Sequence, residues 1–192
     1  MMRKILVLLA HTDITSYTAQ LANAYQSAAE NAGHEVVRVN ISDLNFDPIL
    51  HKGYKEIQPL EQDLLALQER FREADHIVIL YPNWWNTMPA ILKGLFDRFW
   101  LPGFAFNFDK TTHKIIQHLR GKSARVIVVA GTLSPLQTWW KYGDYTNEIR
   151  HSILEFAGLD TKVTAFGPCE RTTDTCRKKW LAQVESLGTR GI

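Results

Sequence analysis

Apolar residues along this chain follow two alternating patterns. Short, nearly continuous apolar runs predict buried strands at residues 4–9, 35–40, 76–81, 124–130 and 161–166. Between them, apolar residues recur at helical spacing and predict helices at residues 15–32, 60–71, 89–100, 145–156 and 172–187. Thr15 or Ser16 can cap the first helix, and Gly33 ends it. Residues 41–54, residues 102–121 and the stretch after residue 130 are expected to be loops.

Strands that alternate with helices are typical of an α/β domain, with a doubly wound parallel sheet and helices on both faces. Five strands fit best the order 2-1-3-4-5, which is the flavodoxin-like order. No internal repeat or linker-like stretch interrupts the sequence, so we expect one domain over residues 1–192. Ligands of such sheets bind beyond the carboxyl ends of the strands, where the strand order reverses. The loops expected there are residues 11–18 and 82–86, with residues 131–133 beside them.

Composition and charge narrow the possible classes of function. Lys and Arg number 22 against 20 Asp and Glu, and a net charge of +2 gives no reason to expect a nucleic-acid partner. No apolar run reaches the roughly 18 residues that a membrane-spanning helix needs, so we expect no transmembrane segment. The start, MMRKILVLLAHTD, superficially suggests a signal peptide, but His11 and Asp13 cut the apolar run short. A buried first strand is the better interpretation.

Cysteine and histidine spacings give no indication of a metal site. Cys169 and Cys176 have six residues between them, which matches neither a CxxC motif nor a zinc-binding spacing. We therefore expect both thiols to be reduced and the protein to be cytoplasmic. The histidines show no HxxxH or HExxH pattern, and we expect no metal ion.

The stretch YPNWWNTMPAILKGLFDRFWLPGFAFNF, residues 81–108, is the most informative part of the chain. It contains two adjacent tryptophans, Trp84 and Trp85, in a turn-forming segment directly after the third strand. Each such ring favours the burial of about 150–250 Å². Either a flat aromatic ligand or a partner subunit is therefore expected to cover them. Pro89 then begins a helix with one apolar side.

This stretch resembles the flavin-binding loop and following helix of the NAD(P)H:quinone oxidoreductases, both the DT-diaphorase type and its shorter bacterial relatives. The shared pattern is aromatic-Pro82-x-x-Trp85-x-x-x-Pro89-Ala90-Ile91-Leu92-Lys93-Gly94-x-Phe96-x-Arg98, continued by Gly103-Phe104-Ala105-aromatic. A weaker likeness covers most of the remaining chain, and the last thirty or so residues contribute least to it.

The resemblance implies a homodimeric flavoprotein enzyme. NAD(P)H would deliver a hydride to flavin N5 and leave, and a quinone or similar acceptor would then take the hydride at the same position, which implies ping-pong kinetics. FMN is expected rather than FAD, because the chain ends soon after its fifth helix and leaves little to cover an adenosine. An azo- or nitroreductase, a regulatory subunit of a potassium-efflux transporter and a flavodoxin-type electron carrier stay open. A carrier is usually acidic, and this chain is not.

The first loop, residues 11–18, combines hydroxyls with the start of a helix. Free N–H groups and the helix dipole suit a phosphate there, with further donors from His11, Ser16, Tyr17 and Thr18. The alternative is ordinary helix capping. Phosphate binding is favoured because the loop is expected beside residues 82–86.

Two further loops are expected to contact the flavin ring. The resemblance assigns this role to residues 82–86, which are Pro82, Asn83, Trp84, Trp85 and Asn86. The family usually has Leu-Gln before its tryptophan and Phe-Gly after it, so the acceptor pocket of this chain is expected to differ in shape and polarity. The alternative is a pair of core tryptophans.

Gly131, Thr132 and Leu133 follow the fourth strand, where the family has a Thr-Thr-Gly-Gly loop at the pyrimidine edge of the flavin. A glycine at this point lets the backbone approach the ring closely. A simple strand-to-loop turn is the alternative.

Tyr142 precedes Gly143 and Asp144 at the place where the family has a histidine implicated in proton transfer. A tyrosine hydroxyl can donate a proton or hydrogen bond to a developing oxyanion, although a phenol is a weaker acid than an imidazolium. A packing role is the alternative for Tyr142.

Phe104, Phe106 and Phe108 lie in a region that, with Trp85, the resemblance assigns to the substrate pocket and the dimer interface. Several apolar residues in one loop are a liability on a monomer, which favours a dimer. Core packing under the loop of residues 102–121 is the alternative.

Overall fold

The computed structural model describes residues 2–192. Its main sheet has five parallel strands in the order β2-β1-β3-β6-β7. The strands are β1 (Lys4–Leu9), β2 (Glu35–Asn40), β3 (His76–Asn83), β6 (Ser123–Ala130) and β7 (Asp160–Phe166). In terms of the main-sheet strands alone this is the order 2-1-3-4-5, so the predicted flavodoxin-like fold class is confirmed.

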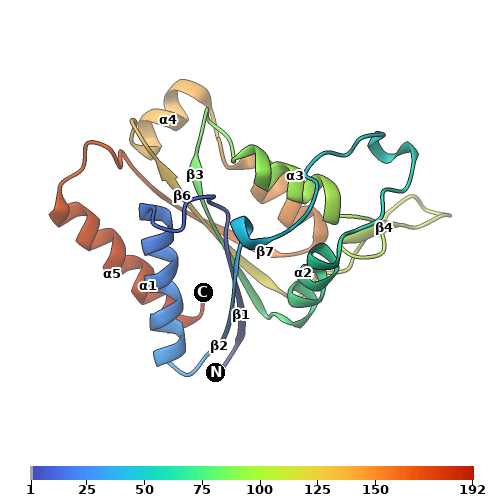
Figure 1. Cartoon of the computed structure of the whole chain (residues 1–192), viewed down its shortest axis with the longest axis horizontal. Coiled ribbons are helices and arrows are strands. Elements are labelled where there is room, and N and C mark those ends of the chain that lie inside the picture. Colours follow the sequence, from blue (N-terminus) through green and yellow to red (C-terminus); the bar gives the residue numbers. More distant parts are fainter. Residues whose placement is uncertain (1) are drawn as a thin grey trace.

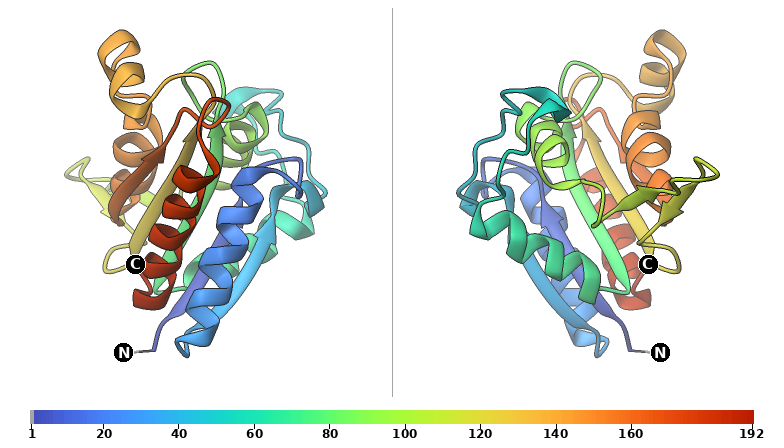
Figure 2. Two further views of the ribbon diagram at one scale, coloured as in Figure 1. Left: turned by 90° about the vertical axis from the view of Figure 1, so that its left-hand side faces the viewer. Right: turned by 90° about the vertical axis from the view of Figure 1, so that its right-hand side faces the viewer.

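Helices cover both faces of the sheet (Figures 1 and 2). On one face α1 (Tyr17–Asn31) and α5 (Asp174–Arg190) lie side by side, and on the other lie α2 (Gln62–Glu73), α3 (Ala90–Phe99) and residues 148–157. Alternate residues of each strand face opposite layers, because successive side chains of a strand point to opposite sides. In β1, Ile5 and Val7 pack with α1 and α5, whereas Leu6 and Leu8 pack with α2 and α3.

Two residues of the α3 pattern, Gly94 and Arg98, have a packing explanation. An added Cβ at Gly94 would lie 2.6 Å from both the Cβ and the carbonyl oxygen of Pro48, so only glycine lets this segment lie against the helix. Arg98 is 1% exposed, and its guanidinium binds Glu61 at 3.0 Å and donates to the carbonyl oxygens of Pro59 and Asp47. Both residues hold the segment between β2 and α2 against α3.

Three expectations from the sequence are corrected. Residues 102–121 are not wholly a loop, since β4 (Phe106–Phe108) and β5 (Ile115–Gln117) form an antiparallel hairpin. The helix predicted at residues 145–156 is present with Ile149 and Ile153 buried, but it is a π-helical segment, Glu148–Leu154, followed by a 3-10 turn, Glu155–Ala157. The stretch after residue 130 contains an additional helix, α4 (Pro135–Tyr142). Short 3-10 turns also occur at Ile41–Asp43 and Gly53–Lys55.

Helix α4 had a recognisable start signal in the sequence. Ser134 accepts a hydrogen bond from the Gln137 N–H at 3.2 Å, and the Gln137 side chain accepts from the Ser134 N–H at 3.0 Å. This is a capping box, and Pro135 occupies the first turn. The helix was not predicted from the sequence because its apolar residues do not form a buried stripe that packs on the core.

Among residues 2–192, every helix is too short or too polar to cross a bilayer.

Candidate functional site

Loops from four strands meet at the carboxyl edge of the sheet, where the strand order reverses between β1 and β3. Two adjoining pockets lie there, of about 480 and 380 Å³, and they share Asn83, Trp85, Gly131 and Thr132. The first is also lined by His11, Ser16, Tyr17, Thr18, Pro82, Trp84, Val129, Cys169 and Glu170. The second is also lined by Asn86, Ala130, Leu133, Thr138 and Tyr142. The structure therefore gathers every residue selected above for cofactor binding, together with Tyr142, into one continuous site.

The N-terminus of α1 forms one end of the first pocket. The Ser16 hydroxyl accepts a hydrogen bond from the Ala19 N–H at 3.2 Å, so Ser16 is the helix cap. Within the described chain the N–H groups of Tyr17 and Thr18 have no acceptor, as expected for a first helical turn. These donors and the positive end of the helix dipole suit an anionic group.

His11 contributes one further donor to this end of the pocket. Its Nδ1 accepts a hydrogen bond from the Asp13 N–H at 2.9 Å, which leaves the ring proton on Nε2. Burial lowers the pKa of His11, and the opposing effect of Asp13 is smaller. The imidazole is therefore a neutral donor near pH 7.

The expectation for the Tyr17 hydroxyl is corrected. It donates to the Arg177 carbonyl oxygen at 3.0 Å, and the Arg177 guanidinium lies 5.4 Å from the ring centroid. Burial is the main reason that the pKa of Tyr17 is raised to about 12. The hydroxyl thus faces α5, and only the backbone N–H of Tyr17 remains for a ligand.

The loop after β3 is a tight turn with an unusual backbone. Trp84 and Thr87 exchange two backbone hydrogen bonds of 3.0 and 3.1 Å, while Trp85 and Asn86 have φ angles of 54° and 66°. Two consecutive left-handed residues define a type I′ turn, which normally prefers Asn-Gly. A tryptophan in this conformation is strained. The turn holds the Trp85 ring 98% exposed above both pockets.

Asparagine oxygens in this loop have no donor. Asn83 Oδ1 and Asn86 Oδ1 are buried, and neither has a hydrogen-bond partner in the part of the chain that the structure describes. The Trp84 ring contacts His11 edge-on, with 5.5 Å between the centroids, and so connects this loop to the first one.

Backbone and side chains from the segment after β7 (Asp160–Phe166) complete the wall beside Gly131. An added Cβ at Gly131 would lie 2.8 Å from Glu170 Oε1. The Glu170 N–H donates to the Gly131 carbonyl oxygen at 3.0 Å, and the Cys169 N–H donates to that of Ala130 at 2.9 Å. Burial raises the pKa of the Cys169 thiol, which keeps it protonated.

Sequence reasoning did not select Cys169 or Glu170. Neither residue belongs to a motif, and the only available signal was topological, because the segment after β7 reaches the same edge of the sheet.

Tyr142 ends α4 at the rim of the second pocket and is 54% exposed, with Lys141 Nζ 5.0 Å from its ring.

The phenylalanines of the hairpin region do not share one environment. The expectation that Phe104 lies at the substrate pocket or dimer interface is corrected. Phe104 is only 3% exposed, and its ring lies 5.7 Å from that of Trp100 within the core. Phe106 is half-buried against Phe156, and Phe108 is 57% exposed.

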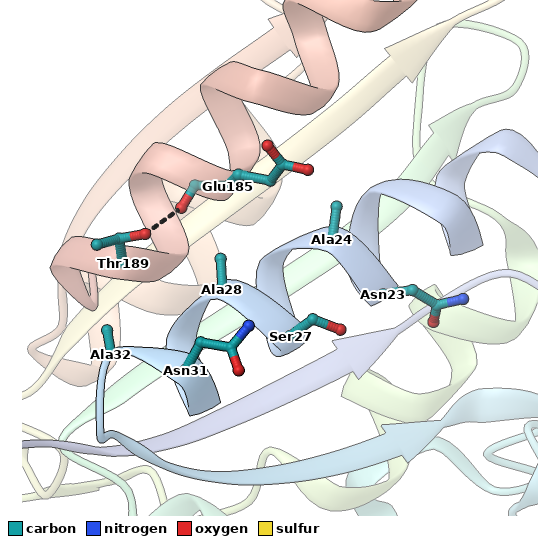
Figure 3. Close-up of a pocket in the computed structure, with 8 residues that line it drawn as sticks. All are labelled: Asn23, Ala24, Ser27, Ala28, Asn31, Ala32, Glu185 and Thr189. Carbon is teal, nitrogen blue, oxygen red and sulfur yellow. Dashed lines mark hydrogen bonds between the residues drawn. The ribbon is translucent and has the colours of Figure 1, made fainter.

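A separate groove of about 580 Å³ lies between α1 and α5 (Figure 3). Its walls are short side chains such as Ala24, Ser27 and Ala28, and Glu185 is its one charged lining residue. The groove runs along the later turns of both helices, away from the N-terminus of α1. It lacks the converging donors of the carboxyl-edge site.

Comparison with known proteins identifies the family and the fold. A family model described as the flavodoxin-like fold matches residues 3–184. The chain belongs to the flavodoxin-like fold family. Within this family it resembles NAD(P)H dehydrogenase [quinone] 1 of Rattus norvegicus, with 30% identity over 181 residues. That match covers 82% of this flavodoxin-like chain but 65% of the rat protein.

Solved structures agree with this assignment. A Streptococcus mutans UA159 protein superimposes with a TM-score of 0.82 and 28% identity, over 98% of this chain and 100% of its own. An FMN-dependent NADH-azoreductase from Bacillus anthracis, solved with FMN, has a TM-score of 0.74 at 19% identity, over 98% and 99% of the two chains. The latter likeness shows the fold. Together with the rat relative, the family match bears out the resemblance to quinone oxidoreductases.

Proposed function

We propose that this protein is a flavin-dependent NAD(P)H:quinone oxidoreductase. The observation that carries the proposal is the convergence of the three loops on one site. Residues from the first loop, the tryptophan loop and the loop after β6 line two adjoining pockets at the sheet edge. The rat relative, named NAD(P)H dehydrogenase [quinone] 1, supports the reaction class.

The residues present fit a flavin mononucleotide. The free N–H groups at the start of α1 and the His11 Nε2–H would hold the phosphate. The unpartnered Asn83 oxygen can accept from an N–H of the ring, and the backbone of Gly131 and Thr132 lines both pockets. The Bacillus anthracis structure, which contains FMN, favours FMN over FAD.

A bound flavin supplies hydride transfer between NAD(P)H and an oxidised acceptor. The protein's own part is positioning and proton supply. Trp85 stands over the junction of the two pockets and would limit the acceptor to a flat ring. The Tyr142 hydroxyl, which lines the same second pocket, would donate a hydrogen bond or proton to an acceptor oxygen as it gains negative charge.

A second copy of the chain is the proposed cover for the hairpin surface. Phe106 and Phe108 line an apolar hollow of about 520 Å³ with Phe96, Trp100 and Phe156. Exposed aromatic rings beside an apolar hollow favour a protein contact.

Reduction of azo compounds is a second candidate activity, favoured by the azoreductase fold neighbour. A cytosolic location and an ancillary role beside a transporter stay predictions.

The test is an anaerobic spectroscopic titration of the purified full chain. After incubation with FMN or FAD and gel filtration, the retained flavin is identified, then bleached with NADH or NADPH and reoxidised with menadione. Bleaching of the flavin absorbance by NADH or NADPH, followed by its recovery with menadione, supports the proposal. A chain that retains neither flavin would refute it. In Tyr142→Phe we expect flavin binding to be unchanged and reoxidation to slow by about ten- to a hundredfold.

A further inference from the structure

Asn86 carries a buried hydrogen-bond acceptor that the fold does not use. Its Oδ1 atom is buried and has no hydrogen-bond partner among residues 2–192. The side chain lines the second pocket, so the orphaned oxygen belongs to the wall of that pocket. A buried acceptor without a donor destabilises the free protein, and a ligand that brings a donor removes this cost.

The backbone explains why an asparagine is tolerated at residue 86, but not why its side chain is kept. Asn86 has a φ of 66°, in the left-handed region that asparagine enters more readily than most residues. It is the second central residue of the type I′ turn, a position at which glycine is usual. Glycine would therefore serve the turn at least as well. The amide group of Asn86 needs a separate explanation, and the pocket beside it offers one.

The turn that carries Asn86 is held from two sides. Trp84 and Thr87 exchange two backbone hydrogen bonds, and Thr87 Oγ1 also donates to Glu148 Oε2 at 3.2 Å. The second contact connects the turn to the π-helical segment Glu148–Leu154. A side chain on a turn anchored in this way loses little further freedom when a ligand binds, so its hydrogen bonds are well suited to recognition.

The second pocket is neutral and has few free hydrogen-bonding groups. None of the described residues that line it is charged. The Thr138 hydroxyl donates to the Ser134 carbonyl oxygen at 2.9 Å and is thus engaged within α4. Asn83 lines both pockets, whereas Asn86 lines the second one alone. The Asn86 oxygen is therefore placed to meet a neutral donor on a molecule in the second pocket, apart from the ring contact given above to Asn83.

We propose that Asn86 recognises the carboxamide of the nicotinamide substrate, with its Oδ1 atom accepting a hydrogen bond from the carboxamide N–H. This role rests on the proposed function, in which NAD(P)H is the hydride donor. A primary amide has two N–H donors and no charge, which complements an unpaired acceptor in a neutral pocket. The bond fixes how the nicotinamide ring is turned, and so which of its atoms faces the flavin. Asn86 thereby determines specificity on the substrate side of the site.

The test compares two dinucleotides that differ only in this group. In 3-acetylpyridine adenine dinucleotide a methyl group replaces the carboxamide nitrogen of NAD⁺, so the carbonyl remains and the N–H donors are lost. Equilibrium dialysis of the flavin-loaded full chain against each oxidised dinucleotide measures binding without turnover. We expect the dissociation constant of the acetylpyridine compound to be about tenfold higher, because a hydrogen bond is lost and the Asn86 oxygen stays unpaired.

Two variants and a control locate the effect at Asn86. Asn86→Gly removes the acceptor and keeps the turn, and its two dissociation constants should agree to within about twofold. Asn86→Asp keeps an acceptor oxygen of the same shape and should retain the difference between the dinucleotides. Asn45→Gly, at an exposed asparagine in the loop after β2, is the matched control and should behave like the original chain. Thermal melting of each variant checks that it is folded.

Each outcome bears on either the reaction or the role of Asn86. A tenfold difference that persists in Asn86→Gly overturns the proposal, as does an original chain that binds both dinucleotides equally or binds neither. Flavin that is retained and bleached by NADH in such a chain leaves the proposed reaction standing and refutes only the role of Asn86. A chain that retains no flavin refutes the proposed reaction, and dialysis of the same samples still decides whether Asn86 distinguishes the two dinucleotides.

Discussion

His76 is expected to make the stability of this protein sensitive to acid. It begins β3, is 2% exposed, and its Nδ1 lies 2.7 Å from Ser123 Oγ, while its Nε2 is buried without a partner in residues 2–192. Burial, followed by the nearby charges of Arg3 and Arg125, lowers the pKa of His76 from 6.5 to about 3. The folded protein therefore keeps this imidazole neutral, and protonation favours the unfolded chain.

The magnitude follows from proton linkage. The pKa of His76 is lower in the folded than in the unfolded chain, so its contribution to the unfolding free energy is complete above pH 6.5. That contribution is lost as the pH falls towards 3. At pH 4 the loss amounts to about 3 kcal/mol, since each pKa unit corresponds to about 1.4 kcal/mol. A domain of this size typically has only about 5–15 kcal/mol in total.

The assay is urea unfolding at pH 7, 5.5 and 4, at constant ionic strength, for the original chain and His76→Asn. Asparagine does not titrate, and carboxylates affect both proteins equally, so the difference in unfolding free energy isolates His76. That difference should change by about 3 kcal/mol between pH 7 and pH 4 in favour of the variant. His118→Asn, at an exposed histidine, should follow the original chain. A difference that is constant with pH would refute this reasoning.

Three further predictions concern the packing of α3 and the tryptophan turn. Arg98→Ala should lower the unfolding free energy by about 3 kcal/mol, because it leaves the Glu61 carboxylate and two carbonyl oxygens without their donor. A decrease below about 1 kcal/mol in the unfolding free energy measured with urea would contradict this. Gly94→Ala should cost about 1–3 kcal/mol, since its Cβ meets Pro48 at 2.6 Å, and an unchanged urea midpoint would be inconsistent with that contact. Trp85→Gly should raise the free energy of unfolding by about 1 kcal/mol, because glycine adopts a φ of 54° without strain. The same variant should bind the acceptor more weakly. Lower stability of this variant would argue against strain at the turn.

The sequence alone determined the order of the main elements and the position of the site. Buried parallel strands are continuous apolar runs and helices have a 3.6-residue period, so both are recorded locally in the chain. Strand topology then brought residues 11–18, 82–86 and 131–133 to one edge, and the pockets found there contain these residues. The long pattern around Trp85 and Arg98 was informative because it combines a pocket-lining loop with a packing motif.

Only the tertiary structure decided which way individual side chains face. The Tyr17 hydroxyl binds α5 rather than a ligand, Phe104 lies in the core, and Glu170 enters the site from a segment without a motif. Each depends on contacts between residues far apart in the chain, which periodicity does not encode. The outward apolar face of α4 is the clearest case, because a helical pattern specifies a face but not whether protein, lipid or water covers it.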